Sequence, residues 1–205
     1  MPLDLRELVR DGRSAVLTME LQQGVVGDTS TFPALAAVVR ERGVLAQTSR
    51  LLDVARSREV PVVHCTAGFR ADRRGSPLSA PLISAALRKP DHMVIGTKAV
   101  ELMPEVGPAP SDLISERSHG VSPFSGTNLD ATLRAFDVAT VIAVGVSLNL
   151  AIPGLAMEAV NLGYRVVIPS DAVAGVPVDY AEALIKNTLS LVATITTVDD
   201  LIQVL

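Results

Sequence analysis

Polar side chains that can do chemistry follow several apolar runs in this 205-residue sequence. Carboxylates, imidazoles, hydroxyls and a thiol are the groups that proteins use for proton transfer and nucleophilic attack. If the apolar runs are parallel strands, their ends meet at one edge of a sheet, where α/β proteins bind small molecules. The sequence therefore predicts one composite site from Glu20, His64-Cys65-Thr66, Glu116 to His119, Gly145 to Asn149 and Ser170-Asp171.

Two nucleophile patterns can be tested against these segments. Residues 145–149, Gly-Val-Ser-Leu-Asn, have the first glycine and the serine of a G-x-S-x-G elbow, but asparagine stands at the last position. Cys65 would need an activating neighbour, and the adjacent His64 points to the opposite face of a strand. These departures favour a turn without a catalytic serine and a buried structural cysteine.

A guanidinium and an imidazole lie in the glycine-containing loop after the third apolar run. Arg117 can bind a carboxylate through two hydrogen bonds, and His119 can reach the predicted site from the same loop. A solvated loop with no role in binding is the alternative for both residues.

The spacing of apolar residues indicates strands that alternate with helices, which implies right-handed βαβ units. We therefore expect one domain over residues 1–205, a three-layer α/β/α fold with a six-stranded, mostly parallel, Rossmann-like sheet. Expected strands cover 14–21, 60–63, 112–116, 140–144 and 164–169, with a short sixth strand in the tail after 191. Expected helices cover 3–10, 35–58, 79–88, 128–136, 149–162 and 177–191, with a terminal helix.

Local signals refine some boundaries. Thr127, with Asp130 three residues later, approximates a capping box for the helix at 128–136. Gly163 is placed to end the helix at 149–162, and Gly43 is a weak point within the helix at 35–58. Residues 89–111 contain four prolines and predict a long, partly irregular segment.

Composition narrows the classes of function. The net charge is −4 and no basic stripe is visible, which argues against a nucleic-acid partner. No apolar run approaches the ~20 residues that a membrane span needs, and the N-terminus lacks the apolar centre of a signal peptide. One cysteine fits a reducing cytoplasm, and the three histidines have no metal-ligand spacing. We expect a small-molecule ligand, no metal and no cofactor.

Three segments together resemble one known family. VLTMELQQGVV is similar to that family's apolar strand ending in an acid, and SPFSGTNLDATLRAF resembles its S-A-F-x-G-T-x-L segment. GVSLNLAIPGLAMEAVNLGYRVVIPSDAVAG resembles its G-V-x-T-N-x-C-V helix and the strand that follows. The family is the isochorismatase-like hydrolases, cysteine hydrolases related to nicotinamidase and N-carbamoylsarcosine amidase. The resemblance covers the chain from about residue 13 to the end.

The resemblance implies a catalytic triad of Asp, Lys and Cys, and this sequence departs from it at every position. Glu20 takes the place of the aspartate, and Ala151 takes the place of the cysteine. The lysine position falls near Ser118, and no lysine lies between Lys98 and Lys186. A thioester mechanism is therefore not expected. Family members that cleave isochorismate also lack the cysteine, although they keep the lysine.

What remains implies non-covalent chemistry. By resemblance, we expect a cis peptide bond between Val146 and Ser147, and free amides from Ser147 to Ala151 that bind an anion or oxyanion. Glu20 beside them, in an apolar cleft, should have a raised pKa and act as acid or base. The expected substrate-binding residues are Arg117, His119, Val146, Ser147 and Asn149.

Two hypotheses of function follow. One is a hydrolase or lyase of a small carboxylate, amide or vinyl ether that works through Glu20. The other is an inactive family member that binds a small ligand or serves as an assembly subunit. The resemblance also implies a homo-oligomer, a dimer or a tetramer.

Overall fold

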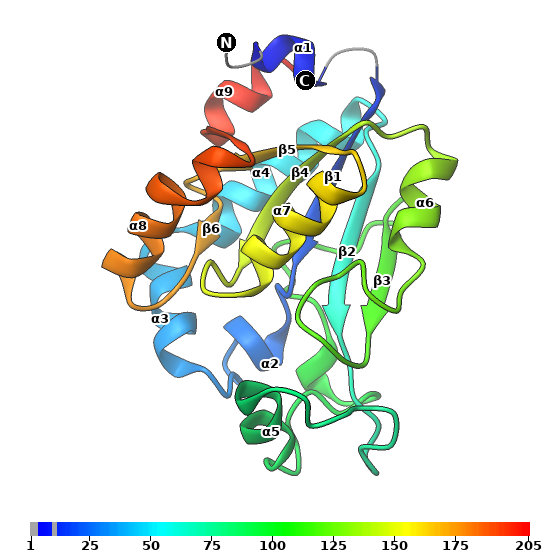
Figure 1. The fold of residues 1–205 in the computed structure, drawn as a ribbon, viewed down its shortest axis with the longest axis vertical. Coiled ribbons are helices and arrows are strands. Elements are labelled where there is room, and N and C mark those ends of the chain that lie inside the picture. Colours follow the sequence, from blue (N-terminus) through cyan, green and yellow to red (C-terminus); the bar gives the residue numbers. More distant parts are fainter. Residues whose placement is uncertain (1–3, 10–11) are drawn as a thin grey trace.

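A parallel sheet forms the centre of the molecule in the computed structural model, which describes residues 4–9 and 12–205 (Figure 1). The strand order is β3-β2-β1-β4-β5-β7, and the short β6 pairs with β4. The strands are β1 Ser14–Met19, β2 Val62–Ala67, β3 Leu113–Arg117, β4 Thr140–Val146, β5 Arg165–Pro169, β6 Val173–Ala174 and β7 Thr194–Thr196. The predicted α/β sheet is confirmed, with seven strands among the described residues instead of six. The extra strand, β6, has two residues and is too short to show a period in the sequence.

Helices cover both faces of this sheet; in Figure 1, α7 lies in front of it and α4 behind. Helices α1 Leu5–Val9, α3 Pro33–Glu41, α4 Val44–Ser57 and α9 Val198–Ile202 pack on one face. Helices α6 Leu129–Ala135, α7 Ala151–Asn161 and α8 Val178–Asn187 pack on the other. Short helices complete the fold: α2 Gln23–Val26, α5 Pro81–Leu87, η2 Lys98–Val100 and η3 Leu189–Leu191.

The two faces of β1 feed two separate apolar clusters. Val16 packs into the cluster under α4, whereas Leu17 and Met19 pack into the cluster under α7. All six residues of β1 are buried because helices cover both faces, which is why the strand is mostly apolar, with only Ser14 and Thr18 polar. Burial of aliphatic surface at roughly 25 cal/mol per Å² on both faces stabilises this arrangement.

Several predicted boundaries are wrong. Strand β1 ends at Met19 instead of residue 21, and helix α8 ends at Asn187 instead of residue 191. The helix expected at 35–58 is two helices, because Gly43 adopts a left-handed conformation with φ 65° between α3 and α4. Strand β2 runs to Ala67, so His64 to Thr66 lie inside the strand instead of after it. Helix α7 begins at Ala151, two residues later than expected, and the loop after Glu20 contains the unexpected helix α2.

The N-terminal helix expected at 3–10 is α1, Leu5–Val9, and residues 3 and 10 lie outside the described part of the chain. Within the described ranges, every helix is too short or too polar to cross a membrane.

Strand order reverses between β1 and β4, the two strands at the centre of the sheet. Chain segments after β1 build the sheet to one side, and segments after β4 build it to the other. The strands come together at Met19 and Gly145, which are paired in register. Gly145 has φ 103°, and a Cβ there would lie 2.3 Å from the Met19 carbonyl oxygen, so only glycine fits. In parallel sheets of this kind, ligands bind beyond the strand ends at such a reversal.

Candidate functional site

Two adjoining cavities lie at the carboxyl ends of β1 and β4. The inner cavity has a volume of about 70 Å³, and the outer cavity has a volume of about 450 Å³. Together they form the cleft, a name used below for both cavities. The residues that line both are Glu20, Val25, Phe32, Leu82, Ser147 and Leu150. The structure therefore has a hollow where the sequence predicted the composite site.

A buried ion pair stands at the inner end of the cleft. Glu20 follows β1 with φ 52°, and its carboxylate contacts the guanidinium of Arg117, the last residue of β3. The side chains are only 15% and 7% exposed. Arg117 also donates from Nη1 to the Gly120 carbonyl at 3.0 Å, while its buried Nε has no hydrogen-bond partner among the described residues. Burial lowers the pKa of Arg117 to about 10, so the guanidinium stays charged at neutral pH.

This pairing changes the chemistry expected of Glu20. The sequence argument placed the carboxyl group in apolar surroundings and left out its nearest charged neighbour, because Arg117 comes from a strand two places away in the sheet. An adjacent positive charge favours the ionised carboxylate. The geometry therefore suits Glu20 to accept a proton as a base more than to donate one as an acid.

The turn between β4 and α7 offers fewer free amides than expected. The peptide bond between Val146 and Ser147 is cis, as the resemblance predicted. The Leu148 amide donates to Ala174 at 2.8 Å, and the amides of Leu150 and Ile152 donate to Ser147 at 3.3 and 3.0 Å. In the described part of the chain, the remaining amides of residues 147, 149 and 151 have no backbone acceptor. These three are the donors available to an anion.

Ala151 lies at the first turn of α7 and lines the inner cavity beside Glu20. It is 4% exposed, and its methyl group can neither attack a substrate nor transfer a proton. Ser147 lines both cavities. The first turn of the helix therefore keeps a position next to the cleft without a nucleophile.

Two other predicted binding residues position the cleft instead of filling it. Asn149 lines the outer cavity, but its side-chain amide forms two hydrogen bonds with the backbone of Val176, one of them 2.9 Å long from the Val176 amide. Those bonds hold the loop after β6 against the start of α7. Val146 is fully buried in the core under α4 and does not line the cleft.

Ser118 and His119 are not brought into the cleft. Ser118 is exposed, and its carbonyl accepts a hydrogen bond from Ser76 at 2.8 Å. The His119 ring lies against Gly126, where an added Cβ would sit 2.5 Å from it. Neither residue lines either cavity; Arg117, the last residue of β3, contacts Glu20, and the loop beyond it reaches the inner cavity through Val121.

The loop that contains Ser118 and His119 is fastened to α7. Ser122 and Ser125 both donate to the carboxylate of Glu158, the second at 3.0 Å. Thr127, the predicted cap of α6, accepts from the Leu129 amide at 3.2 Å, although the cap position itself is Asn128. These contacts fix the path of the chain between Arg117 and α6.

His92 lines the inner cavity, and the sequence analysis did not single it out. It lies in the irregular segment 89–111, far along the chain from the strand ends that were used as a guide. Its neighbours Thr31 and Phe69 come from two further segments. Only the folded loops bring these groups together, so no local pattern marks them.

The polar residues of β2 belong to the interior. His64 bonds through Nδ1 to the Thr18 hydroxyl at 2.8 Å and through Nε2 to Asp112 at 3.0 Å. Arg56 contacts the same carboxylate at 2.7 and 3.2 Å. Hydroxyl, imidazole and carboxylate are in the order of a catalytic triad, but His64 and Thr18 are fully buried and line neither cavity. We call these four residues the interior network.

Cys65 and Asp171 are also removed from the site. Burial raises the pKa of the Cys65 thiol to about 12, so the reactive thiolate is absent at neutral pH. Asp171 accepts a hydrogen bond from the Val198 amide at 2.9 Å and so holds the start of α9. Both residues are structural.

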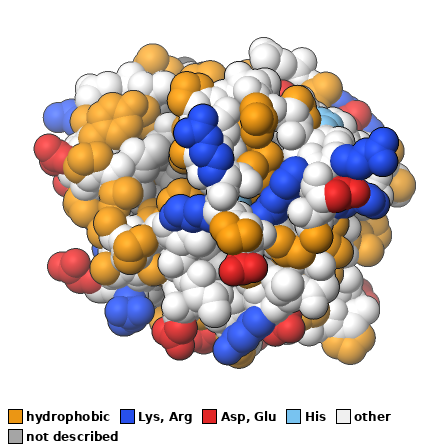
Figure 2. Space-filling model, turned by 90° about the horizontal axis from the view of Figure 1, so that it is seen from below, with side chains coloured by type: hydrophobic (Ala, Val, Ile, Leu, Met, Phe, Trp, Pro, Cys, Tyr) orange, Lys and Arg blue, Asp and Glu red, His pale blue; other side chains and the backbone are white. Residues whose placement is uncertain are grey.

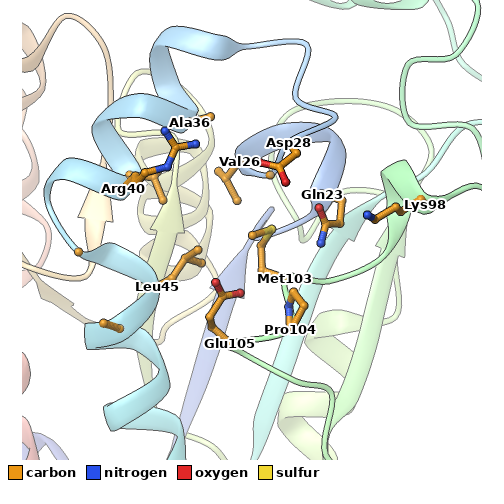
Figure 3. A pocket seen from close by; sticks show the side chains of 14 residues that line it. Gln23, Val26, Asp28, Ala36, Arg40, Leu45, Lys98, Met103, Pro104 and Glu105 are labelled. Carbon is orange, nitrogen blue, oxygen red and sulfur yellow. The ribbon is translucent and has the colours of Figure 1, made fainter.

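A separate cavity of about 490 Å³ opens between α2, α3, α4 and the segment after η2 (Figure 3). Asp28, Arg40, Lys98 and Glu105 lie at its rim and are exposed, while Val26, Leu45 and Met103 form apolar parts of its wall. Neither Glu20 nor Arg117 lines this cavity, so its size alone does not make it the catalytic site.

Basic side chains surround the carboxyl ends of the strands. Figure 2 views this end of the molecule and shows Lys and Arg side chains around its centre, among hydrophobic ones. Between residues 69 and 98 the basic residues outnumber the acidic Asp72 and Asp91. The basic residues of this segment are Arg70, Arg73, Arg74, Arg88, Lys89 and Lys98. A field of this sign attracts anionic ligands.

Comparison with known proteins agrees with the resemblance. The chain is 24% identical over 209 residues to the ureidoacrylate amidohydrolase RutB of Agrobacterium fabrum, covering 94% of this chain and 90% of the relative. A cysteine hydrolase from Pseudomonas syringae shares the fold at a TM-score of 0.81 and 21% identity, covering 99% of this chain and 94% of that one.

An N-carbamoylsarcosine amidase from Thermoplasma acidophilum shares the fold at a TM-score of 0.71 and 22% identity, covering 91% of this chain and 97% of that one. The model of the isochorismatase domain matches residues 14–200. That match includes both central strands, the cleft and most of the surrounding helices, and the chain belongs to the isochorismatase domain family.

Proposed function

We propose that the protein hydrolyses a small amide or carbamoyl compound that carries a carboxylate, by non-covalent base catalysis through Glu20. The observation that carries the proposal is the Glu20–Arg117 pair inside a cleft that the first turn of α7 also lines. The names of two similar proteins, a ureidoacrylate amidohydrolase and an N-carbamoylsarcosine amidase, support this substrate class. The basic face in Figure 2 supports an anionic substrate.

In the proposed reaction, the Glu20 carboxylate takes a proton from water as the water oxygen bonds to the substrate carbonyl carbon. The developing oxyanion accepts hydrogen bonds from the free amides at the start of α7, among them that of Ala151. Protonated Glu20 then returns the proton to the leaving nitrogen as the carbon–nitrogen bond breaks. Arg117 keeps the carboxylate ionised before the reaction.

Turnover of a small panel tests the proposal. Ureidoacrylate and N-carbamoylsarcosine represent the amide class, and isochorismate represents the vinyl ether that the family also uses. We expect release of ammonia from at least one amide and its loss in Glu20→Gln. Equal rates for Glu20→Gln and the unchanged protein would rule out Glu20 as the base.

A binding protein without turnover is the second candidate, and Ala151 favours it. Position 151, next to Glu20, lacks a nucleophile, and the negative charge of Glu20 is balanced by the positive charge of Arg117. In that case the same compounds raise the melting temperature by mass action but release no product. A melting shift that is lost in Arg117→Met, together with no turnover of any panel member, would select this candidate.

Self-association is a further part of the proposal. Met157 and Val160 on α7 are 45% and 40% exposed, and Leu191 is 80% exposed. Large apolar side chains on one face of a helix are typical of interfaces. We infer a homo-oligomer, a dimer or tetramer, and sedimentation velocity of the chain and of Met157→Glu tests it. A single monomeric species in both would contradict it.

A further inference from the structure

His92 is held in place by backbone contacts from two segments. The neighbouring Met93 carbonyl accepts from the Phe69 amide at 2.8 Å, and the Phe69 carbonyl accepts from the Ile95 amide at 2.9 Å. Arg73 donates to the carbonyl of His92 itself at 2.9 Å. The segment around Met93 therefore pairs with the chain that follows β2, and this pairing places His92 at the inner cavity.

The imidazole ring is fixed as firmly as its backbone. Phe69 stacks on it with ring centres 5.8 Å apart, and Phe32 meets its edge at 5.7 Å. The Thr31 hydroxyl is hydrogen-bonded to Nδ1 at 2.9 Å. A ring held by two aromatic side chains and one hydrogen bond has its other nitrogen, Nε2, in a defined direction.

Nε2 makes no hydrogen bond to any group in residues 4–9 and 12–205. His92 is 5% exposed, and apart from Glu20, Arg117 and Ser147 the other residues that line the inner cavity are apolar. Nε2 is not among the fully buried unpaired atoms of the described residues, so a group from outside the protein can reach it. A polar group bound in the cavity that His92 lines with Glu20 and Arg117 can therefore serve as its partner.

Two cations near the ring influence its charge. Burial, Arg73 and Lys89 lower the pKa of His92 to about 4, so the imidazole is neutral at neutral pH. A neutral ring with Nδ1 engaged by Thr31 presents one proton or one lone pair at Nε2. It can bind a polar substrate group without adding a charge to the cleft.

We propose that His92 is a substrate-contacting residue whose Nε2 forms a hydrogen bond with the amide or carbamoyl group of the substrate, in the inner cavity that Glu20 and Arg117 also line. Thr31 is the positioning residue that sets the ring. The proposal rests on the proposed function for its substrate class, and it adds a fourth polar contact to an otherwise apolar wall.

Three substitutions at one position separate contact from packing. His92→Gln keeps a polar atom near Nε2, His92→Asn keeps one near Nδ1, and His92→Phe keeps only the ring. With ureidoacrylate as substrate, we expect kcat/KM to fall about 10- to 100-fold in His92→Asn and His92→Phe, because a buried hydrogen bond is lost. His92→Gln should lose about threefold. His119→Asn, outside the cleft, is the matched control and should keep its rate.

A spectroscopic readout does not depend on turnover. The chain has three histidines, so long-range ¹H–¹⁵N spectra resolve each imidazole. Saturating ureidoacrylate, added to the Glu20→Gln variant, should shift Nε2 of His92 and leave His64 and His119 unchanged. A shift with ureidoacrylate, together with no turnover of any panel compound by the unchanged protein, would support the contact and reject hydrolysis. Turnover with equal kcat/KM in His92→Asn, or no shift at saturation, would overturn the contact and leave the hydrolase proposal intact.

Discussion

Two charge clusters lie within the sheet region, and they differ in how completely their polar atoms are paired. In the interior network, Asp112 accepts from Arg56, from the Ala109 amide at 2.8 Å and from His64. At the cleft, Arg117 has a cavity beside it and an Nε that finds no partner in the described part of the chain. Both clusters join residues that are far apart in sequence, and both contain an arginine–carboxylate pair that is largely shielded from solvent.

How completely the polar atoms are paired distinguishes a structural cluster from a binding site better than the types of residue do. The interior network has the side chains of a catalytic triad, yet it has no space for a substrate and few polar atoms left to offer. The Glu20–Arg117 pair has fewer contacts, but it has a cavity and free amides next to it. A buried polar atom without a partner, beside a hollow, is the more informative sign of a binding site.

Removing the carboxylate from the cleft should have the largest effect on activity. We expect Glu20→Gln to lower kcat/KM for the best panel substrate by about 10²- to 10⁴-fold, because a positioned base contributes that much. Its free energy of unfolding should fall by about 1–3 kcal/mol, less than in the next variant, because glutamine offers the buried Arg117 an oxygen but no negative charge. Steady-state kinetics and urea titration measure both quantities. A loss of stability in Glu20→Gln as large as that in Asp112→Ala would contradict the view that one cluster serves activity and the other serves stability.

Removing the carboxylate from the interior network should do the reverse. Asp112→Ala leaves Arg56 and His64 without their shared acceptor and should cost about 3–5 kcal/mol in the free energy of unfolding. The folded fraction should keep its kcat/KM, since Asp112 does not line the cleft. Urea titration with active-site normalised kinetics checks this, and Asp53→Ala, an exposed partner of the same arginine, is the control.

Acid should destabilise the protein through its buried histidines. Burial lowers the pKa of His64 and, with Arg73 and Lys89, lowers that of His92 to about 4. Between pH 6.5 and 4, the unfolded chain binds protons that the folded chain does not, so stability falls as pH falls. Between pH 7 and pH 4, the free energy of unfolding should fall by about 2 kcal/mol less in His92→Asn than in the unchanged protein. Parallel curves in urea titrations over this range would contradict it.

The smallest expected effect is a difference in alkylation rate between the native Cys65 and a cysteine introduced by Ala151→Cys. Cys65 is buried and its raised pKa, about 12, makes it unreactive. Ala151→Cys places a thiol next to the cleft at a helix N-terminus, which favours the thiolate. Iodoacetamide should modify the new thiol at least about tenfold faster than Cys65, as read by mass spectrometry. Equal rates would mean that the inner cavity does not admit even a small reagent.

Much of the fold follows from local chemistry. Apolar runs such as 14–19 are buried on both faces, so their composition marks them as central strands without reference to the rest of the chain. Gly43 was visible as a weak point, but its positive φ, which divides one helix into two, depends on how both helices pack on the sheet. The two-residue β6 exists only because β4 is there to pair with it.

The site was predicted less completely because it depends on tertiary contacts. Glu20 and the turn before α7 line one cavity, as the meeting of strand ends at one edge of a parallel sheet leads one to expect, and their roles stay predictions. The pairing of Glu20 with Arg117 joins β1 to β3, which are separated by β2 in the sheet. The position of His92 at the inner cavity depends on an irregular loop. No periodic signal encodes either contact. Asn149 and His64 show the converse, polar residues near the edge whose hydrogen bonds are used within the fold.

The close contact between Gly145 and Met19 has a consequence for how this family can diverge. The two halves of the sheet meet there through backbone atoms alone, with no side chain between them. The distance between the ends of β1 and β4 is therefore independent of the residues that follow each strand. Substitutions at positions 20 and 151 change the side chains that face a ligand without changing the strand backbone that holds them. Reaction chemistry can change, or be lost, while the framework of the sheet stays constant.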